Sequence, residues 1–373
     1  MKPVHENDLI EELTKGFKRS PIQLNRRQEA DAEIVLLPSS PDCLLAVTTD
    51  SLSEEITSGL YEDPYLAGWM TVMANLSDLA AVGASPLGLL VSEILPANLD
   101  RRAIGQLQKG IQDACELCGT HVLGGDTNSG ERLVLTGTAF GVCFGRTYLS
   151  RTGCKPGDLL FATGHLGGGN AFALRLFSDA VQSCLPFSAR DRAVGPPSAT
   201  GSGGAQLYRP QARLREGESL CGIATACMDT SDGVIATLDQ LMRLNRCGFE
   251  VTDQWESLLD PLVRAEFESH GLPAWTALAG QHGEFELLFT VAPSDREILM
   301  GMSSKAGWKP LELGTVAAGR ETILPLDGFD VALDTAYLRN LPSQCGSDIS
   351  SYVRALFEYD MNIQKGEASN VNL

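Results

Sequence analysis

Residues 75–86 read NLSDLAAVGASP, and they place one carboxylate, that of Asp78, inside a helix that is otherwise apolar. Apolar residues recur at helical spacing from Trp69 onward, and Gly83 and Pro86 end the pattern. The spacing predicts a well-buried helix. A carboxylate in such a helix is costly to bury without a cation or several hydrogen-bond donors, the alternative being an exposed helix face or a satisfied cap.

The segments around this helix predict a mixture of strands and helices. Before it we expect an amphipathic helix at residues 8–18 and strands at 34–37 and 43–47. After it we expect, in order, a strand at 87–95, a helix at 99–118, a strand at 121–123, a turn at 124–126 and a strand at 133–144. Adjacent strands mixed with helical crossovers indicate an α+β fold rather than a doubly wound parallel sheet.

The second half of the chain continues in the same way after a short, turn-rich segment at residues 150–158. The elements expected there are strands at 159–163, 224–228, 249–251, 287–291 and 311–316, and helices from 170 and at 231–245. Residues 186–206, which include three prolines and the run ATGSGGA, predict a mobile surface loop. With 373 residues the chain is expected to form two domains, at 1–149 and 150–345, and a C-terminal tail at 346–373.

The composition excludes several classes of function. A net charge of −18 opposes binding to nucleic acid, because such proteins need clustered Lys and Arg. The chain has no apolar run of roughly 18 residues and no signal-peptide pattern, so we expect a cytoplasmic protein without a membrane partner. The ten cysteines are then expected to be reduced, and the CxxC pair Cys115 and Cys118 to pack inside a helix. A net negative charge repels a phosphate ligand, unless divalent cations bind some of the carboxylates and then bind the phosphate themselves.

Aspartates lie at or near the ends of several expected elements, where they are candidate ligands of a hard cation. They are Asp31 before a strand, Asp50 after one, Asp78 in the apolar helix, Asp126 after a strand, and Asp229 and Asp232 around a helix start. Capping accounts for one carboxylate at that helix start and not for two. Two carboxylates about 4 Å apart repel by roughly 4 kcal/mol at an effective dielectric near 20, so a shared cation is a sensible reason for the pair.

Two glycine-rich stretches carry weaker signals. The run Gly164 to Gly169 matches neither GxGxxG nor a Walker loop, and we interpret it as a tight turn from a strand into a helix. For Gly124-Gly125-Asp126-Thr127, an ordinary turn and a binding site are equally open.

In combination, these segments resemble the thiamine-monophosphate kinase family, within the AIR-synthase-like (PurM-like) superfamily of ATP-binding proteins. The three main matches, in the family's order, are residues 75–86, Gly124-Gly125-Asp126-Thr127 and Asp229-Thr230-Ser231-Asp232-Gly233. Further matches are Thr48-Thr49-Asp50, Arg151 with Gly153, Pro156, Gly157 and Asp158, then Tyr208-Arg209-Pro210, and Gly283 to Phe289. The resemblance spans about residues 30–290, and the combination is specific although each piece alone is not.

The resemblance implies a two-domain AIR-synthase-like architecture, a homodimer formed by the N-terminal domains, and an ATP- and Mg²⁺-dependent phosphotransferase acting on a phosphorylated small molecule. By motif match the Mg²⁺ ligands would be Asp31, Thr49, Asp50, Asp78, Asp126, Asp229 and Asp232, with Asp78, Asp126 and Asp232 serving catalysis. Gly125, Arg151 and Ser231 would contact the nucleotide, and Thr57 and Glu284 would bind the acceptor. A phosphate acceptor needs no general base, so positioning and charge neutralisation would supply most of the catalysis.

The acceptor side departs from the family pattern. Thr57 replaces a histidine, Gly283-Glu284-Phe285 replaces an acidic-aspartate-tyrosine signature, and neither Trp308 nor Tyr337 matches the C-terminal aromatic residue expected against thiamine. Two alternatives therefore stay open. One is an AIR-synthase-like enzyme that activates an amide oxygen with ATP, and the other is a regulator that binds ATP without turnover, against which the complete aspartate set argues.

Overall fold

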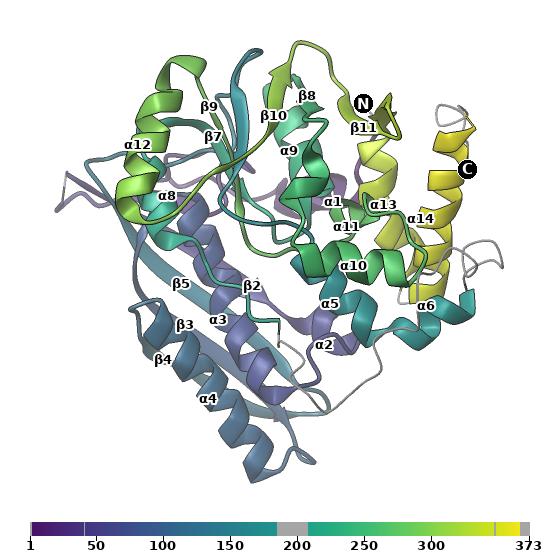
Figure 1. Cartoon of the computed structure of the whole chain (residues 1–373). Helices are drawn as coiled ribbons and strands as arrows, with labels where there is room; N and C mark the ends of the chain where they lie inside the picture. Colours follow the sequence, from purple (N-terminus) through teal and green to yellow (C-terminus); the bar gives the residue numbers. More distant parts are fainter. Residues whose placement is uncertain (1, 41, 185–207, 347, 366–373) are drawn as a thin grey trace.

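The structure is a computed structural model that describes residues 2–40, 42–184, 208–346 and 348–365, and it contains two β-sheets, one in each half of the chain (Figure 1). The strand order is β1-β2-β5-β3-β4 in the first sheet and β12-β11-β8-β10-β6-β9-β7 in the second. Most neighbouring strands are antiparallel, whereas β3 and β4, and β8 and β11, run parallel. The predicted α+β fold is confirmed. The loop expected at 186–206 lies outside the described residues.

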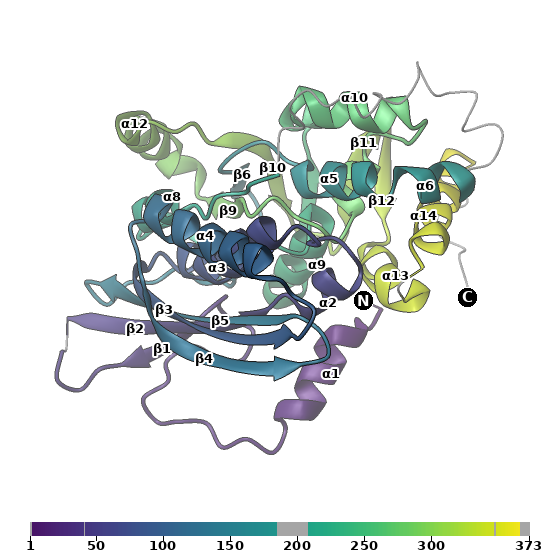
Figure 2. The same cartoon turned by 90° about the horizontal axis from the view of Figure 1, so that it is seen from below.

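The first half of the chain follows the predicted order of elements closely. Its elements are α1 (His5–Thr14), β1 (Glu33–Leu36), β2 (Cys43–Ser51), α2 (Ser53–Thr57), α3 (Pro64–Ala81), β3 (Ser85–Pro96), α4 (Arg101–Leu117), β4 (Val122–Gly130) and β5 (Val134–Phe144). Figure 2 shows α3 and α4 on one side of the five-stranded sheet. Strands β3 and β4 are joined by the crossover helix α4, which is why they run parallel.

Helix α3 contacts elements of both halves of the chain. Asp63 caps its first turn, and between residues 66 and 81 nearly every side chain is buried. The burial arises because α3 contacts β2 and β5 on one side, α4 on another, and α8 (Leu214–Leu220) and β7 (Ala224–Asp229) of the second half. A Cβ at Gly68 would lie 2.1 Å from the carbonyl oxygen of Leu107 on α4, so glycine permits the close helix contact. The predicted buried helix is confirmed, and Asp78 lies in its last turn.

Strand β4 differs from the prediction. Residues 124–126, expected as a turn, lie inside β4, where Gly125 and Asp126 pair with Val91 and Ser92 of β3. A Cβ at Gly125 would lie 1.8 Å from the carbonyl oxygen of Val91, so the close approach of the two strands requires glycine there. The local glycine signal favours a turn, but pairing with a strand distant in sequence decides the conformation.

The second half contains the seven-stranded sheet and the helices around it. Besides α8 and β7, its elements are β6 (Leu159–Ala162), α5 (Gly168–Leu176), α6 (Ser178–Cys184), α9 (Val234–Asn245), β8 (Gly248–Val251), α10 (Pro261–Ser269), α11 (Thr276–Ala279), β9 (Leu287–Val291), α12 (Arg296–Ala306), β10 (Leu311–Ala317), β11 (Thr322–Leu326), β12 (Phe329–Leu333), α13 (Thr335–Cys345) and α14 (Ile349–Gln364). The expected tail from residue 346 thus contains α14, which packs against α13 and α6 and buries Leu356 and Phe357. The domain limits 1–149 and 150–345 stay predictions.

Backbone hydrogen bonds connect the two halves next to the aspartates. The N–H of Arg151 donates to the carbonyl oxygen of Glu29 at 2.7 Å, and the N–H of Cys227 on β7 donates to the carbonyl oxygen of Ser150 at 2.8 Å. The segment after β5 therefore joins the chain before β1 to the edge strand of the second sheet. The end of β7 is consequently brought beside α3.

Two smaller predictions concern membranes and cysteines. Over the described ranges, no helix is both long and apolar enough to cross a membrane. The described cysteines are free thiols, and Cys115 is buried in α4, in the packing position expected of it. The cytoplasmic location stays a prediction.

Candidate metal and nucleotide site

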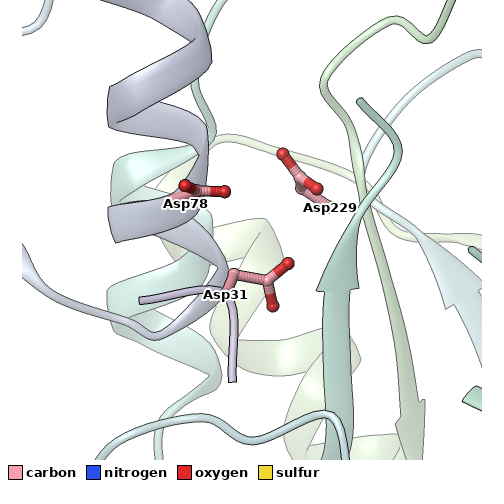
Figure 3. Close-up of side chains that lie close together, drawn as sticks. All are labelled: Asp31, Asp78 and Asp229. Carbon is pink, nitrogen blue, oxygen red and sulfur yellow. The ribbon is translucent and has the colours of Figure 1, made fainter. Parts of the chain in front are cut away.

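Three aspartates from separate segments converge at the junction of the two halves (Figure 3). Asp31 precedes β1, Asp78 lies in the last turn of α3, and Asp229 ends β7. One carboxylate oxygen of each lies within 4.8 Å of those of the other two. Asp229 is 1% exposed, so this negative charge is largely removed from water. Three oxygen donors at this spacing suit a hard divalent cation such as Mg²⁺.

The carboxylate of Asp31 shows most directly that the arrangement fits a cation. Its Oδ1 accepts a hydrogen bond from Nη2 of Arg151 at 2.7 Å. Its Oδ2 is buried and has no hydrogen-bond partner among the described residues. A buried acceptor without a partner is costly, and a cation between the three carboxylates would satisfy it.

Neighbouring hydroxyl groups orient the other two carboxylates. Thr48 on β2 donates to Oδ2 of Asp78. Ser77 and Ser231 donate to the two oxygens of Asp229, at 2.6 and 2.9 Å. Neither Thr48 nor Ser77 was predicted to have a role, although each lies in a matched segment within two residues of an aspartate.

Burial and mutual repulsion raise the pKa values of these carboxylates. The pKa of Asp229 is raised to about 7, mainly by burial and to a smaller extent by the charge of Asp31. Burial, followed by the charges of Asp50, Asp229 and Asp31, raises the pKa of Asp78 well above its usual value. The raised pKa values indicate that the positive charge of Arg151 alone does not offset the burial and mutual repulsion of these carboxylates, and a divalent cation would supply more positive charge.

Asp50 and Asp232 lie around the three converging aspartates. The N–H of Asp50 donates to Oδ1 of Asn75 at 3.1 Å. The pKa of Asp50 is raised to about 6, mainly by burial and to a smaller extent by the charges of Asp232 and Asp31. Glu55, which the sequence analysis missed, has a pKa raised to about 7 by burial, and its Oε2 has no partner in the described part of the chain. The acidic region therefore extends beyond the three aspartates.

Thr49 and Asp126 lie on the other face of the first sheet. Side chains alternate between faces along a strand, so Thr49 points away from α3 because Thr48 points toward it. The hydroxyl groups of Thr49 and Thr138 lie 3.0 Å apart on that outer face. Continuing the strand register through Leu90 and β4 places Asp126 there too. Within one copy of the chain, these two predicted ligands do not join the converging carboxylates.

Residues 283–286, which contain the predicted acceptor ligand Glu284, are hydrogen-bonded directly to residues 229–233. The N–H of Gly283 donates to the carbonyl oxygen of Ser231 at 3.0 Å, and the N–H of Thr230 donates to the carbonyl oxygen of Glu286 at 2.8 Å. A Cβ at Gly283 would lie 1.4 Å from the carbonyl oxygen of Thr230, so only glycine permits this contact. The two predicted elements are therefore one structural unit.

Glu284 is buried within this unit. Its Oε2 accepts the N–H of Gly167 at 2.8 Å, whereas its Oε1 is buried without a described partner. Burial raises the pKa of Glu284 to about 8. The next residue, Phe285, has a φ of +60° and packs into the core of the first half. A positive φ is strained for a bulky residue and is found where packing fixes a functional segment.

A cavity of about 110 Å³ is lined by Gly280, Gln281 and His282, which directly precede residues 283–286. Its described lining is without charged residues and includes Ser58, Asn170, His282 and Tyr352. A cavity of about 150 Å³ can bind benzene, so this one has roughly the size of a single ring. Thr57 is exposed one residue before Ser58. Tyr352 on α14 could not be predicted, because its place in the cavity and its hydrogen bond to the carbonyl oxygen of Ala279 depend on tertiary packing.

The remaining predictions about glycines and aromatic residues have mixed outcomes. The run from Gly164 forms the tight turn between β6 and α5, as expected. The nucleotide contacts of Gly125, Arg151 and Ser231 stay predictions. Trp308 and Tyr337 are not among the described residues that line the cavity with His282 and Tyr352.

Comparisons with known proteins support this assignment of the fold. The family of AIR synthase related proteins, N-terminal domain, matches residues 29–143. Thiamine-monophosphate kinase of Pyrococcus horikoshii is 31% identical over 67% of this chain and 73% of its own length. The enzyme of the same name from Methanocaldococcus jannaschii is 29% identical over 85% of this chain and 96% of its own length. A solved structure described as AaThiL complexed with AMPPCP and TMP has a TM-score of 0.66 at 22% identity, covering 89% of this chain and 96% of that one.

The fold and the cluster of carboxylates thus define an AIR-synthase-like protein. The chain belongs to the thiamine-monophosphate kinase family. The predicted architecture, and the prediction of an ATP-dependent kinase of this family, are confirmed.

Proposed function

We propose that this chain transfers the terminal phosphoryl group of ATP to thiamine monophosphate, with Mg²⁺ held by Asp31, Asp78 and Asp229. The observation that carries the proposal is the convergence of these carboxylates, together with the unpartnered Oδ2 of Asp31. The names of the relatives, and the AMPPCP and TMP in the solved structure described above, support both substrates.

The residues of the chain would act mainly by positioning. Bound Mg²⁺ would supply neutralisation of the negative charge on the terminal phosphates. Ser77 and Ser231 would hold the Asp229 carboxylate in place, and Arg151 would add positive charge beside Asp31. The acceptor phosphate is already ionised, so no side chain need remove a proton from it.

One of the two rings of thiamine would occupy the cavity lined by His282 and Tyr352. The Tyr352 ring lines this cavity, and its hydroxyl group donates to the carbonyl oxygen of Ala279 at 3.3 Å. Changing Tyr352→Ala should raise the KM for thiamine monophosphate and leave the KM for ATP unchanged. Tyr352→Phe keeps the ring and should behave as the wild type. Equal KM values in the alanine variant would remove Tyr352 from the acceptor site.

A kinetic assay tests the reaction itself. The purified chain is incubated with Mg²⁺, ATP and thiamine monophosphate, and ADP, free phosphate and thiamine diphosphate are followed separately. Equal amounts of ADP and thiamine diphosphate are expected. ADP with free phosphate in the presence of an amide substrate would favour the amide-activating alternative. Nucleotide binding without ADP formation over a panel of acceptors would favour a regulator.

A homodimer through the outer face of the first sheet belongs to the same proposal. Leu87, Leu90 and Leu123 on β3 and β4 are 54%, 40% and 60% exposed. Apolar side chains grouped on a surface in this way mark protein interfaces. A second copy packed there would also lie against Thr49 and Asp126, which supports a ligand role for Asp126 in the dimer.

Light scattering after size-exclusion chromatography tests the dimer. The wild type should have twice the mass of one chain, and the double variant Leu90→Asp, Leu123→Asp should have the mass of one. As a control, Phe329→Asp changes an exposed apolar residue in the second half and should remain dimeric. A monomeric wild type, or a double variant that stays dimeric, would contradict this interface.

A further inference from the structure

The side chain of Asn245, the last residue of α9, hydrogen-bonds to the backbone of the segment that contains Arg151. Its Nδ2 donates to the carbonyl oxygen of Arg151 at 2.8 Å, and its Oδ1 accepts the N–H of Gly153 at 2.7 Å. The second Nδ2 hydrogen is donated to the carbonyl oxygen of Leu241 at 2.8 Å, one turn earlier in α9. These bonds fix the amide orientation, because a flipped amide would place oxygen against two carbonyl oxygens.

The same segment is held from two other sides. The N–H of Arg151 donates to the carbonyl oxygen of Glu29 at 2.7 Å, two residues before Asp31. Gly153 has a φ of +133°, and a Cβ there would lie 2.3 Å from the carbonyl oxygen of Thr225 on β7. The backbone of residues 151–153 is therefore enclosed by the chain before β1, by β7 and by the amide of Asn245.

The Arg151 side chain extends from this enclosed backbone toward the aspartates. Its Nη2 bonds to Asp31, while its Nε is buried without a hydrogen-bond partner among the described residues. That buried donor remains available for an acceptor such as a phosphate oxygen. Helix α9 begins directly after Asp232-Gly233 and ends at Asn245, so one rigid element connects the aspartate motif to the arginine segment.

We propose that Asn245 is a positioning residue for the nucleotide. By holding the backbone of Arg151, its amide aims the guanidinium group at Asp31 and at the phosphates of ATP. The inference rests on the proposed function, because Arg151 meets phosphates only if ATP binds at the aspartates. Small displacements of a charged group that contacts a ligand can lower activity by factors on the order of 100, so a single amide can matter.

The experiment measures the Kd of a nonhydrolysable ATP analogue by calorimetry in the presence of Mg²⁺. Asn245→Ala should raise this Kd on the order of tenfold. Asn245→Asp keeps the acceptor for Gly153 but places oxygen against the two carbonyl oxygens, and it should raise the Kd similarly. If Asn245 acts through Arg151, the double variant Asn245→Ala, Arg151→Ala should bind no more weakly than Arg151→Ala alone.

Asn340 on α13 provides a matched control. Its Nδ2 donates to the carbonyl oxygen of Pro3 and its Oδ1 accepts the N–H of His5, each at 3.0 Å, so it makes the same pair of backbone bonds elsewhere. Asn340→Ala should leave the Kd unchanged.

The outcomes separate this inference from the function on which it rests. Wild-type affinity in both Asn245 variants would overturn the positioning role alone. Additive losses in the double variant would also overturn it, because Asn245 would then act independently of Arg151. A wild-type chain that binds no analogue with Mg²⁺ would overturn the proposed function as well.

Discussion

At the scale of single residues, Asp78 shows how a carboxylate that suits a binding site can lower the stability of the folded chain. Its pKa is raised by burial and by the charges of Asp50, Asp229 and Asp31, so its ionised form is unfavourable without a cation. Asp78→Asn should therefore remove Mg²⁺-dependent ATP binding and make the metal-free chain more stable at pH 8. Calorimetry with the ATP analogue and urea unfolding measure the two effects.

A surface aspartate gives the control for this prediction. Asp113→Asn removes a partly exposed carboxylate that pairs with Lys109 at 2.8 Å on α4, and it should change neither nucleotide affinity nor the effect of Mg²⁺. Nucleotide affinity that survives in the Asp78 variant would exclude Asp78 from the site.

Glu284 should give the folded chain a measurable dependence on pH. Burial raises its pKa from 4.5 to about 8, so between these values the folded state binds more protons than the unfolded state. Its contribution to the free energy of unfolding therefore falls as the pH rises through this window, by at most about 1.4 kcal/mol per pH unit. Glu284→Gln resembles the protonated form and should gain stability relative to the wild type from pH 5 to pH 8.

Urea unfolding at several pH values checks the prediction for Glu284. Glu312→Gln, which changes an exposed carboxylate paired with Arg296, should keep the pH dependence of the wild type. Parallel curves for the wild type and the Glu284 variant would show that Glu284 is ionised in the folded chain.

At the scale of secondary structure, local patterns predicted elements whose partners are nearby and missed those fixed by distant pairing. Helix α3 was predicted from its apolar spacing, because burial on every side leaves a continuous signal in the sequence. Only the start of β4 was predicted, because Gly124 and Gly125 resemble a turn, while their conformation is set by pairing with β3. The hairpin of β11 and β12 was also missed, although Asp327-Gly328 between the strands is a turn signal.

The same distinction applies to the site. The aspartates could be predicted because each lies in a recognisable segment, and Asp31, Asp78 and Asp229 do converge. The face of the sheet to which Asp126 points could not be predicted, because it depends on the register of three strand pairs. Asn245 and Tyr352 gave no signal, since their roles depend on contacts with segments far away in sequence.

The pairing of β3 and β4 can be tested with two adjacent glycines. A Cβ at Gly125 would lie 1.8 Å from the carbonyl oxygen of Val91, whereas a Cβ at Gly124 would meet only the Leu90 side chain, at 3.7 Å. Gly125→Ala should therefore lower the free energy of unfolding by about 2 kcal/mol or more, and Gly124→Ala by less than about 1 kcal/mol. Urea unfolding of both variants measures the difference, and equal effects would contradict the close approach of these strands.

At the scale of the whole molecule, the ligand site joins the two halves of the chain. Asp31 and Asp78 belong to the first half and Asp229 to the second, and without a cation their charges repel each other across the junction. Hydrogen bonds of the Arg151 segment hold the junction together against this repulsion. Binding of Mg²⁺ with a nucleotide should therefore stabilise the entire fold and not one half alone.

Thermal unfolding provides the corresponding prediction. A ligand that binds only the folded state at 100 times its Kd stabilises that state by about 2.7 kcal/mol, so Mg²⁺ with the nonhydrolysable ATP analogue should raise the Tm of the single unfolding transition. The analogue with EDTA should give little increase, because the carboxylates would then face the phosphates without cations. Asp78→Asn should lose the increase while unfolding as one transition. A ligand-dependent shift that is equally large in EDTA would show that nucleotide binding does not need the metal, and would separate the aspartate cluster from the nucleotide site.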